Sequence, residues 1–122
     1  MKPLFAALAL LAAALPAHAE GGDATAGELV FKRQCAVCHS QLDGKNMMGP
    51  SLFGLVGRKA GTVAGFKYSA ANQASDLVWD AEKLDPYLTN PRAVVPGTTM
   101  AYGGLKIDGQ RSDLIAYLTT LK

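Results

Sequence analysis

The amino-acid sequence predicts one mostly helical domain, and three observations favour that fold class. Near the C-terminus apolar side chains recur at positions i, i+3, i+4 and i+7, which places them on one face of a helix. They are Leu114, Tyr117, Leu118 and Leu121. No segment alternates apolar and polar residues convincingly, and glycines or prolines interrupt almost every apolar run between residues 44 and 65. A chain of 122 residues has room for one domain.

The N-terminal segment, residues 1–19, has the pattern of a secretory signal peptide. Lys2 precedes an apolar run over residues 4–15, and the small-residue pattern Ala17-His18-Ala19 follows Pro16. The run is too short to span a bilayer, which takes about 20 residues. We expect cleavage after Ala19, with residues 20–122 forming the domain; an uncleaved N-terminal anchor is the alternative. Cleavage removes Lys2, so the formal charge falls from +2 to +1.

Two further helices are predicted from capping residues. Asp23 can cap a helix whose apolar positions Leu29, Val30 and Phe31 precede Cys35. Asp80 can cap a second helix with apolar positions Leu84, Tyr87 and Leu88, and Pro91 after Asn90 is a common stop. Pro86 lies inside this second helix, where we expect it to kink or restart the helix with Asp85 as a second cap.

Composition excludes several classes of protein. Hydrophobic residues make up 49% of the chain and charged residues 18%, which excludes a disordered tail. Lys and Arg never occur in runs longer than two, so neither a nucleic-acid-binding face nor a polybasic membrane patch is expected. Aromatic residues contribute only 7%, which leaves little bulky volume for a core. Something other than side chains is needed to complete that core.

The run Cys35-Ala36-Val37-Cys38-His39 predicts covalent attachment of a c-type haem. In such a site two thiols add across the haem vinyl groups, and the adjacent histidine becomes an axial ligand of the iron. Three alternatives compete with this interpretation: a structural disulfide, a thioredoxin-like redox pair and half of a zinc site. Zinc needs about four ligands, and residues 20–122 hold two cysteines and one histidine. A redox pair favours a βαβ context, and a disulfide over so short a loop stabilises little.

A second axial ligand cannot be histidine, because His39 is the only one in residues 20–122. Methionine, lysine or an open position remain. Met47 and Met48 follow His39 by eight and nine residues, and this short spacing favours a position on the same side of the ring as His39. Met100 lies 61 residues downstream of His39, after the turn-like residues 96–99, and can approach from the opposite face. Core filling is the alternative role for Met100.

A longer set of motifs extends from Gly22 to Lys122. It comprises Gly27, Phe31, Cys35-x-x-Cys38-His39, Gly49-Pro50-x-Leu52-x-Gly54, Gly57-Arg58, Tyr68, Asn72, Trp79, Tyr87-Leu88-x-Asn90-Pro91, Pro96-Gly97-Thr98-x-Met100 and residues 113–118. In this order and spacing the chain resembles the small class I cytochromes c, of the bacterial cytochrome c2 and mitochondrial type. The resemblance implies an all-α cytochrome c fold, in which short helices and loops wrap one covalently attached haem c and the terminal helices pack together.

The resemblance also implies a role for individual residues. Cys35 and Cys38 would form the thioethers, and His39 and Met100 would bind the iron. Gly27 and Phe31 would meet Leu114 and Tyr117 where the terminal helices cross.

Around the ligands the resemblance implies a set of hydrogen bonds. The Pro50 carbonyl would accept from His39, and Tyr87 would hydrogen-bond near the Met100 sulfur. Asn72 and Thr98 would hold ordered water beside that sulfur. Trp79 and Tyr68 would donate to a buried haem propionate, with Arg58 offsetting its charge. Plain core packing is the alternative for Trp79. Tyr102 stands where relatives usually carry Phe.

The function implied by the resemblance is one-electron transfer rather than enzymatic catalysis. A soluble monomer in the bacterial periplasm is expected. Its redox partners would be a quinol-cytochrome c oxidoreductase, a terminal oxidase, a photosynthetic reaction centre or a periplasmic dehydrogenase. The alternative is a small haem protein with peroxidase or gas-binding activity, which needs an open iron position and an acid/base group that the sequence does not supply.

Overall fold

The computed structural model describes residues 1, 3 and 21–122 of the chain. The expected signal peptide, residues 1–19, therefore lies outside the described residues apart from Met1 and Pro3. The described residues form five helices: α1 (Ala24–Gln34), α2 (Ala70–Ala74), α3 (Ala81–Thr89), α4 (Pro91–Val94) and α5 (Asp108–Thr119). Within residues 21–122 no strand forms, and a single bridge pairs Lys59 with Val78. The all-α fold class is confirmed.

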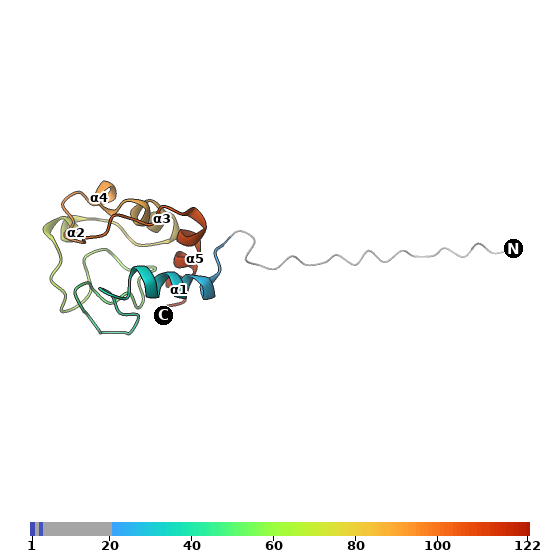
Figure 1. The fold of residues 1–122 in the computed structure, drawn as a ribbon, viewed down its shortest axis with the longest axis horizontal. Coiled ribbons are helices and arrows are strands. Elements are labelled where there is room, and N and C mark those ends of the chain that lie inside the picture. The colour runs from blue at the N-terminus through green and yellow to red at the C-terminus, as the bar shows by residue number, and fades with distance from the viewer. Residues whose placement is uncertain (2, 4–20) are drawn as a thin grey trace.

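Helix α1 near the start of the domain and helix α5 near its C-terminus pack closely against each other (Figure 1). The rings of Phe31 and Tyr117 lie 5.5 Å apart between them. Gly27 faces the backbone of α5, where a Cβ would collide with the Asp113 carbonyl oxygen and lie 2.8 Å from Tyr117 Cβ. The predicted contact between the terminal helices is therefore present, and it depends on a residue without a side chain.

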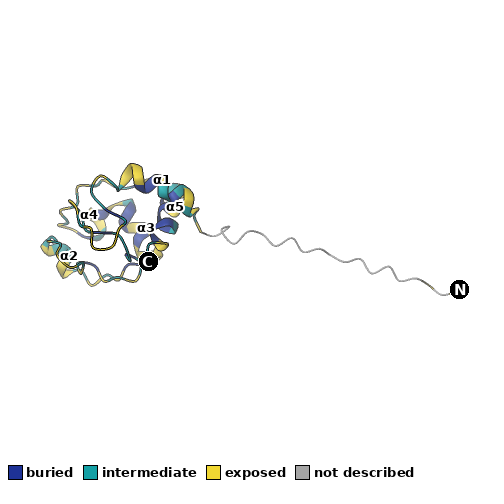
Figure 2. Ribbon diagram, turned by 90° about the horizontal axis from the view of Figure 1, so that it is seen from below, coloured by how far each residue is buried: buried dark blue, intermediate teal, exposed yellow. Residues whose placement is uncertain are grey.

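Both predicted N-caps form. The Asp23 carboxylate accepts hydrogen bonds from the backbone N–H groups of Thr25 and Ala26, and the Asp80 carboxylate accepts from Lys83 N at 2.7 Å. Each bond satisfies a donor that the first turn of a helix leaves without a partner. Exposed residues lie on the outer surfaces of the helices and buried residues face the interior (Figure 2).

Helix α3 runs from Ala81 to Thr89 with Pro86 inside it, so the helix does not restart at the proline. The kink expected at Pro86 stays a prediction. Three buried side chains, Leu84, Tyr87 and Leu88, anchor it on both sides of the proline. Asp85 does not act as a second cap. Its carboxylate instead accepts a hydrogen bond from Arg111 Nε at 2.7 Å, so a tertiary ion pair replaces the local bond expected from sequence.

The Arg111 side chain is only 8% exposed, and its guanidinium contacts three parts of the fold. Besides Asp85 of α3, its guanidinium donates to Asp108 at 2.8 Å and to the Leu105 carbonyl at 3.0 Å. Leu105 ends the segment that follows Met100, and its N–H donates to Leu88 O. The guanidinium thus connects α3, α5 and the chain after Met100.

Helix α5 ends at Thr119, so Leu121 does not belong to it as the periodic pattern predicted. Leu114, Tyr117 and Leu118 are buried as expected, and Leu121 packs against the core from beyond the helix end. The Leu121 carbonyl accepts a hydrogen bond from Gly54 N at 2.6 Å, which fixes the chain end in a non-helical position. Among the described residues, no helix combines the length and apolarity needed to cross a membrane.

Candidate functional site

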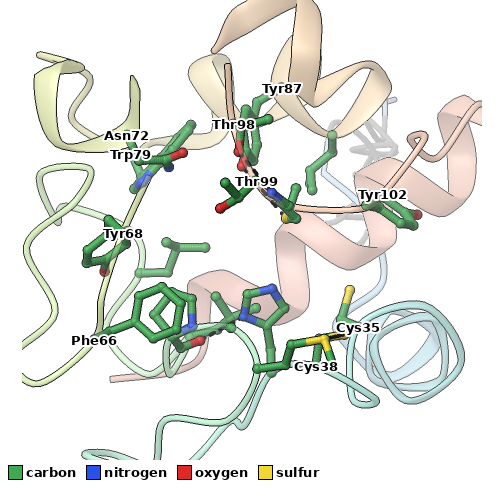
Figure 3. Close-up of a pocket in the computed structure, with 18 of the residues that line it drawn as sticks. Cys35, Cys38, Phe66, Tyr68, Asn72, Trp79, Tyr87, Thr98, Thr99 and Tyr102 are labelled. Carbon is green, nitrogen blue, oxygen red and sulfur yellow. Dashed lines mark hydrogen bonds between the residues drawn. The ribbon is translucent and has the colours of Figure 1, made fainter. Parts of the chain in front are cut away.

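A cavity of about 290 Å³ lies among the helices and the long middle loop. All eleven residues singled out from the sequence line it: Cys35, Cys38, His39, Pro50, Arg58, Tyr68, Asn72, Trp79, Tyr87, Thr98 and Met100. Figure 3 shows Cys35 and Cys38 on one side, with Tyr87, Thr98 and Thr99 across the cavity from them. Tyr68, Asn72 and Trp79 occupy a further side. Segments far apart in the sequence therefore converge on one chamber.

The two cysteines lie where α1 ends and the chain turns. Cys35 is the C-cap of α1, and its carbonyl accepts hydrogen bonds from the N–H groups of Cys38 and His39. Both thiols are free. Burial raises the pKa of Cys35 to about 11, with Cys38 adding to the effect. A redox-active dithiol depends on a lowered pKa, so this environment disfavours the thioredoxin-like interpretation.

The zinc alternative lacks further ligands near Cys35, Cys38 and His39 in the described residues. Residues 21–122 contain no group of three or more His, Cys, Asp or Glu side chains suited to hold a metal ion. Cys35, Cys38 and His39 therefore gain no acidic or thiolate neighbour from the rest of the described fold.

His39 is held in one orientation by its neighbours. Its Nδ1 lies 2.7 Å from the Pro50 carbonyl oxygen, which accepts the ring N–H and leaves Nε2 as the basic nitrogen. A Cβ at Gly49 would lie 2.7 Å from the same Nδ1, so only glycine fits against the ring. Burial lowers the pKa of His39, which favours the neutral imidazole that a metal ligand requires.

Met100 is oriented by contacts with Tyr87 and Thr98. Tyr87 lies on α3, and its hydroxyl is 3.8 Å from the Met100 sulfur. Burial raises the pKa of Tyr87 to about 12, so the phenol stays neutral and keeps its proton to donate. Met100 N donates to Thr98 Oγ1 at 3.3 Å. These contacts aim the thioether into the cavity.

The other two methionines of the domain occupy different places. Met48 also lines the cavity, but on the cysteine side, with its sulfur 3.7 Å from Cys38 Sγ, and the residue is 81% exposed. Met47 does not line the cavity. Of the three methionines, Met100 is the one that Tyr87 contacts across the cavity from the cysteines.

The remaining polar residues form the third side of the cavity. Tyr68 OH accepts from Val63 N at 3.0 Å, which leaves its proton free for another acceptor. Arg58 Nη1 donates to Phe53 O at 3.1 Å, and burial lowers the pKa of Arg58.

Trp79 and Asn72 line the same side of the cavity. Trp79 is buried, and its ring centre lies 4.6 Å from that of Tyr87. Asn72 Oδ1 accepts from Ser69 Oγ at 2.9 Å. Together with Arg58 and Tyr68, these residues place several hydrogen-bond donors beside one apolar space.

The sequence did not show which apolar residues line the cavity, or that Gly49 packs against the His39 ring. The apolar residues are Leu52, Leu55, Phe66, Leu84, Leu88, Leu114 and Leu118. Their sequence positions mark them as hydrophobic but not as cavity-facing. Gly49 gave a signal, because it directly precedes Pro50 within a shared motif, although its contact with His39 was not foreseen.

The cavity fits a flat apolar prosthetic group that carries acidic substituents. The cavity is lined by two thiols, a neutral imidazole and a thioether. Apolar side chains form most of its remaining walls. The donor set of one nitrogen and one thioether sulfur is typical of haem iron in cytochromes c. The fold and the site define a c-type haem protein.

Comparisons with known proteins give the family. The cytochrome c family model matches residues 24–122. Over 103 residues the chain is 50% identical to "Cytochrome c" of Guizotia abyssinica, covering 84% of this chain and 93% of that protein. It is 45% identical over 101 residues to "Cytochrome c2" of Rhodopila globiformis, covering 83% and 95%. The chain belongs to the cytochrome c family: it is an electron carrier with covalently attached haem c and iron, and not an enzyme.

Proposed function

We propose that residues 20–122 carry single electrons through the bacterial periplasm. The signal-peptide pattern of residues 1–19 and the similarity to a cytochrome c2 support this location. The partners proposed are the membrane complexes and dehydrogenases that exchange one electron with such carriers: a quinol-oxidising complex, a terminal oxidase, a reaction centre or a periplasmic dehydrogenase. The protein acts as a monomer.

We assign His39 and Met100 as the axial ligands, and Cys35 and Cys38 as the thioether positions. The observation that carries this assignment is the orientation of both ligands within one cavity, His39 by Pro50 and Met100 by Tyr87. When bound, haem supplies the one-electron Fe²⁺/Fe³⁺ couple. His39 and Met100 would hold the iron in both states, so little reorganisation would accompany electron exchange. The thioether and the apolar walls both favour the ferrous state.

The polar side of the cavity is proposed to receive a propionate. Tyr68 and Trp79 would donate hydrogen bonds to it, and the Arg58 guanidinium would offset its charge. A carboxylate removed from water costs several kcal/mol unless donors and an opposite charge meet it. Asn72 and Thr98 are proposed to hold water near the Met100 sulfur.

Carbon monoxide binding to the ferrous holoprotein tests the ligand assignment. The wild-type protein is expected to resist extraction of haem by acid acetone and to show no spectral change with carbon monoxide. Met100→Ala opens the position and is expected to bind carbon monoxide rapidly. Met47→Ala is the control, because Met47 lies outside the cavity. Rapid binding by the wild-type protein would refute the assignment.

Location is tested by fractionating cells that express the full chain. The mature protein is expected in the periplasmic fraction, with a mass that corresponds to a chain beginning at Glu20 plus one haem. A chain that retains residues 1–19 in the membrane fraction would instead support the uncleaved anchor.

A further inference from the structure

A hydrogen bond joins two distant segments of the chain at the cavity. The Tyr102 hydroxyl donates to Gln34 Oε1 at 3.0 Å, although the residues are 68 positions apart in the sequence. Both residues line the cavity. Figure 3 shows Tyr102 on the same side of the chamber as Cys35, which follows Gln34 directly. The bond therefore connects the attachment side of the cavity to the segment that carries Met100.

The two partners differ in how firmly the fold holds them. Gln34 is the last residue of α1, and α1 is fixed by its extensive packing against α5. Tyr102 lies two residues after Met100 in a segment without regular structure. In the described part of the chain, residues 99–104 form no backbone-to-backbone hydrogen bond, and the nearest such bonds lie at Thr98 and Leu105. Side chains therefore carry much of the task of holding this segment in place.

We propose that the Tyr102–Gln34 hydrogen bond is a clasp that holds the Met100 segment against the end of α1 and limits how often Met100 leaves the iron. The inference rests on the proposed ligation by Met100. Tyr102 and Gln34 are positioning residues, since neither is a ligand. The clasp needs the phenol hydroxyl, because a phenylalanine ring at this position fills the same space without a donor.

The ring of Tyr102 contributes packing, and its hydroxyl contributes the hydrogen bond to Gln34. The ring is half-buried and packs against the hydrophobic core, whereas the hydroxyl reaches an exposed glutamine. Tyr102→Phe therefore removes the clasp and keeps the packing. Because water competes for this exposed bond, its net contribution lies at the lower end for hydrogen bonds. We expect loss of the clasp to speed opening of the Met100 segment about 2- to 5-fold.

Imidazole binding to the ferric holoprotein measures that opening. Imidazole can reach the iron only when Met100 has moved away, so at saturating imidazole the observed rate reports the opening step. The variants are Tyr102→Phe, Gln34→Leu and the double variant. Each single variant is expected to bind about 2- to 5-fold faster than wild type. The double variant should be no faster than the faster single variant, because both changes remove the same bond.

A matched tyrosine–glutamine pair elsewhere in the chain provides the control. Tyr117 OH donates to Gln41 Oε1 at 2.6 Å, and neither residue lines the cavity. Tyr117→Phe is expected to leave imidazole binding unchanged. Denaturant unfolding of every variant then separates local opening from a general loss of stability.

Three results would overturn the clasp. The first is an unchanged rate in Tyr102→Phe, and the second is a double variant whose acceleration equals the product of the single effects. The third is equal acceleration in Tyr117→Phe, which would show a global effect. If only the clasp fails, the wild-type protein would still show the far-red absorption band of a thioether–ferric iron bond, and Met100 ligation would stand. If that band is absent and the wild-type protein binds imidazole without an opening step, Met100 ligation and the clasp both fail.

Discussion

Replacing a single glycine in α1 is expected to destabilise the protein although alanine is the better helix former. Gly27 lies within α1 and faces α5. An alanine Cβ there would collide with the Asp113 carbonyl oxygen, and it would lie 2.5 Å from the Asp113 carbonyl carbon and 2.8 Å from Tyr117 Cβ. Ordinary carbon–carbon contacts need about 3.5 Å or more. The obstacle is mostly backbone, so the helices themselves must move apart.

The expected net loss from Gly27→Ala is about 2–3 kcal/mol. Helix propensity alone would stabilise the variant by about 1 kcal/mol. Overpacking typically costs 1–3 kcal/mol, and a contact with backbone belongs at the upper end. Separating α1 from α5 also exposes apolar surface of Phe31 and Leu114, at about 25 cal/mol per Å². These two losses exceed the gain in propensity.

Denaturant unfolding of the holoprotein measures this difference. Gly109→Ala is the control, since Gly109 lies in the first turn of α5 and a Cβ there meets nothing within 4 Å. That substitution is expected to stabilise the protein by up to about 1 kcal/mol. Replacing glycine by alanine should thus lower the free energy of unfolding at position 27 and raise it at position 109. A Gly27→Ala variant as stable as wild type would refute the assigned role of the α1–α5 contact.

Three further predictions concern the site and its support. Tyr87→Phe should lower the reduction potential in a redox titration, because the hydroxyl near the Met100 sulfur withdraws electron density from it and favours ferrous iron. Arg111→Met should lower the free energy of unfolding by about 1–3 kcal/mol, since it removes donors to Asp85, Asp108 and a backbone carbonyl. Electron exchange with the natural partner should change less than about 10-fold with ionic strength, because the domain is close to neutral.

Each of these predictions has an outcome that contradicts it. A Tyr87→Phe protein with an unchanged or higher potential would show that the hydroxyl does not act on the ligand. Arg33→Met, on the exposed side of α1, is the control for Arg111→Met and should change stability by no more than about 0.5 kcal/mol. Equal losses in the two arginine variants would refute the buried network, and a steep salt dependence would refute the neutral docking surface.

Local sequence was enough for features that depend on neighbouring residues. Asp23 and Asp80 cap α1 and α3 as expected, because a cap involves only the next few N–H groups. Local sequence failed for α2 and α4, whose five and four residues are too few to show a period. It also failed at Asp85, since the partner that takes its carboxylate lies 26 residues away on α5.

The haem-attachment chemistry follows from a short run of residues, whereas the geometry of the site depends on how distant segments pack. The Cys35–His39 run specifies haem attachment because five consecutive residues suffice for it. Only the fold places Met100 against Tyr87, leaves Met48 beside Cys38, and brings Tyr102 to Gln34. Spacing along a chain limits what one element can reach, but contacts between distant segments depend on how the helices pack. That packing rests on backbone approaches, such as the one at Gly27, that no local pattern reveals.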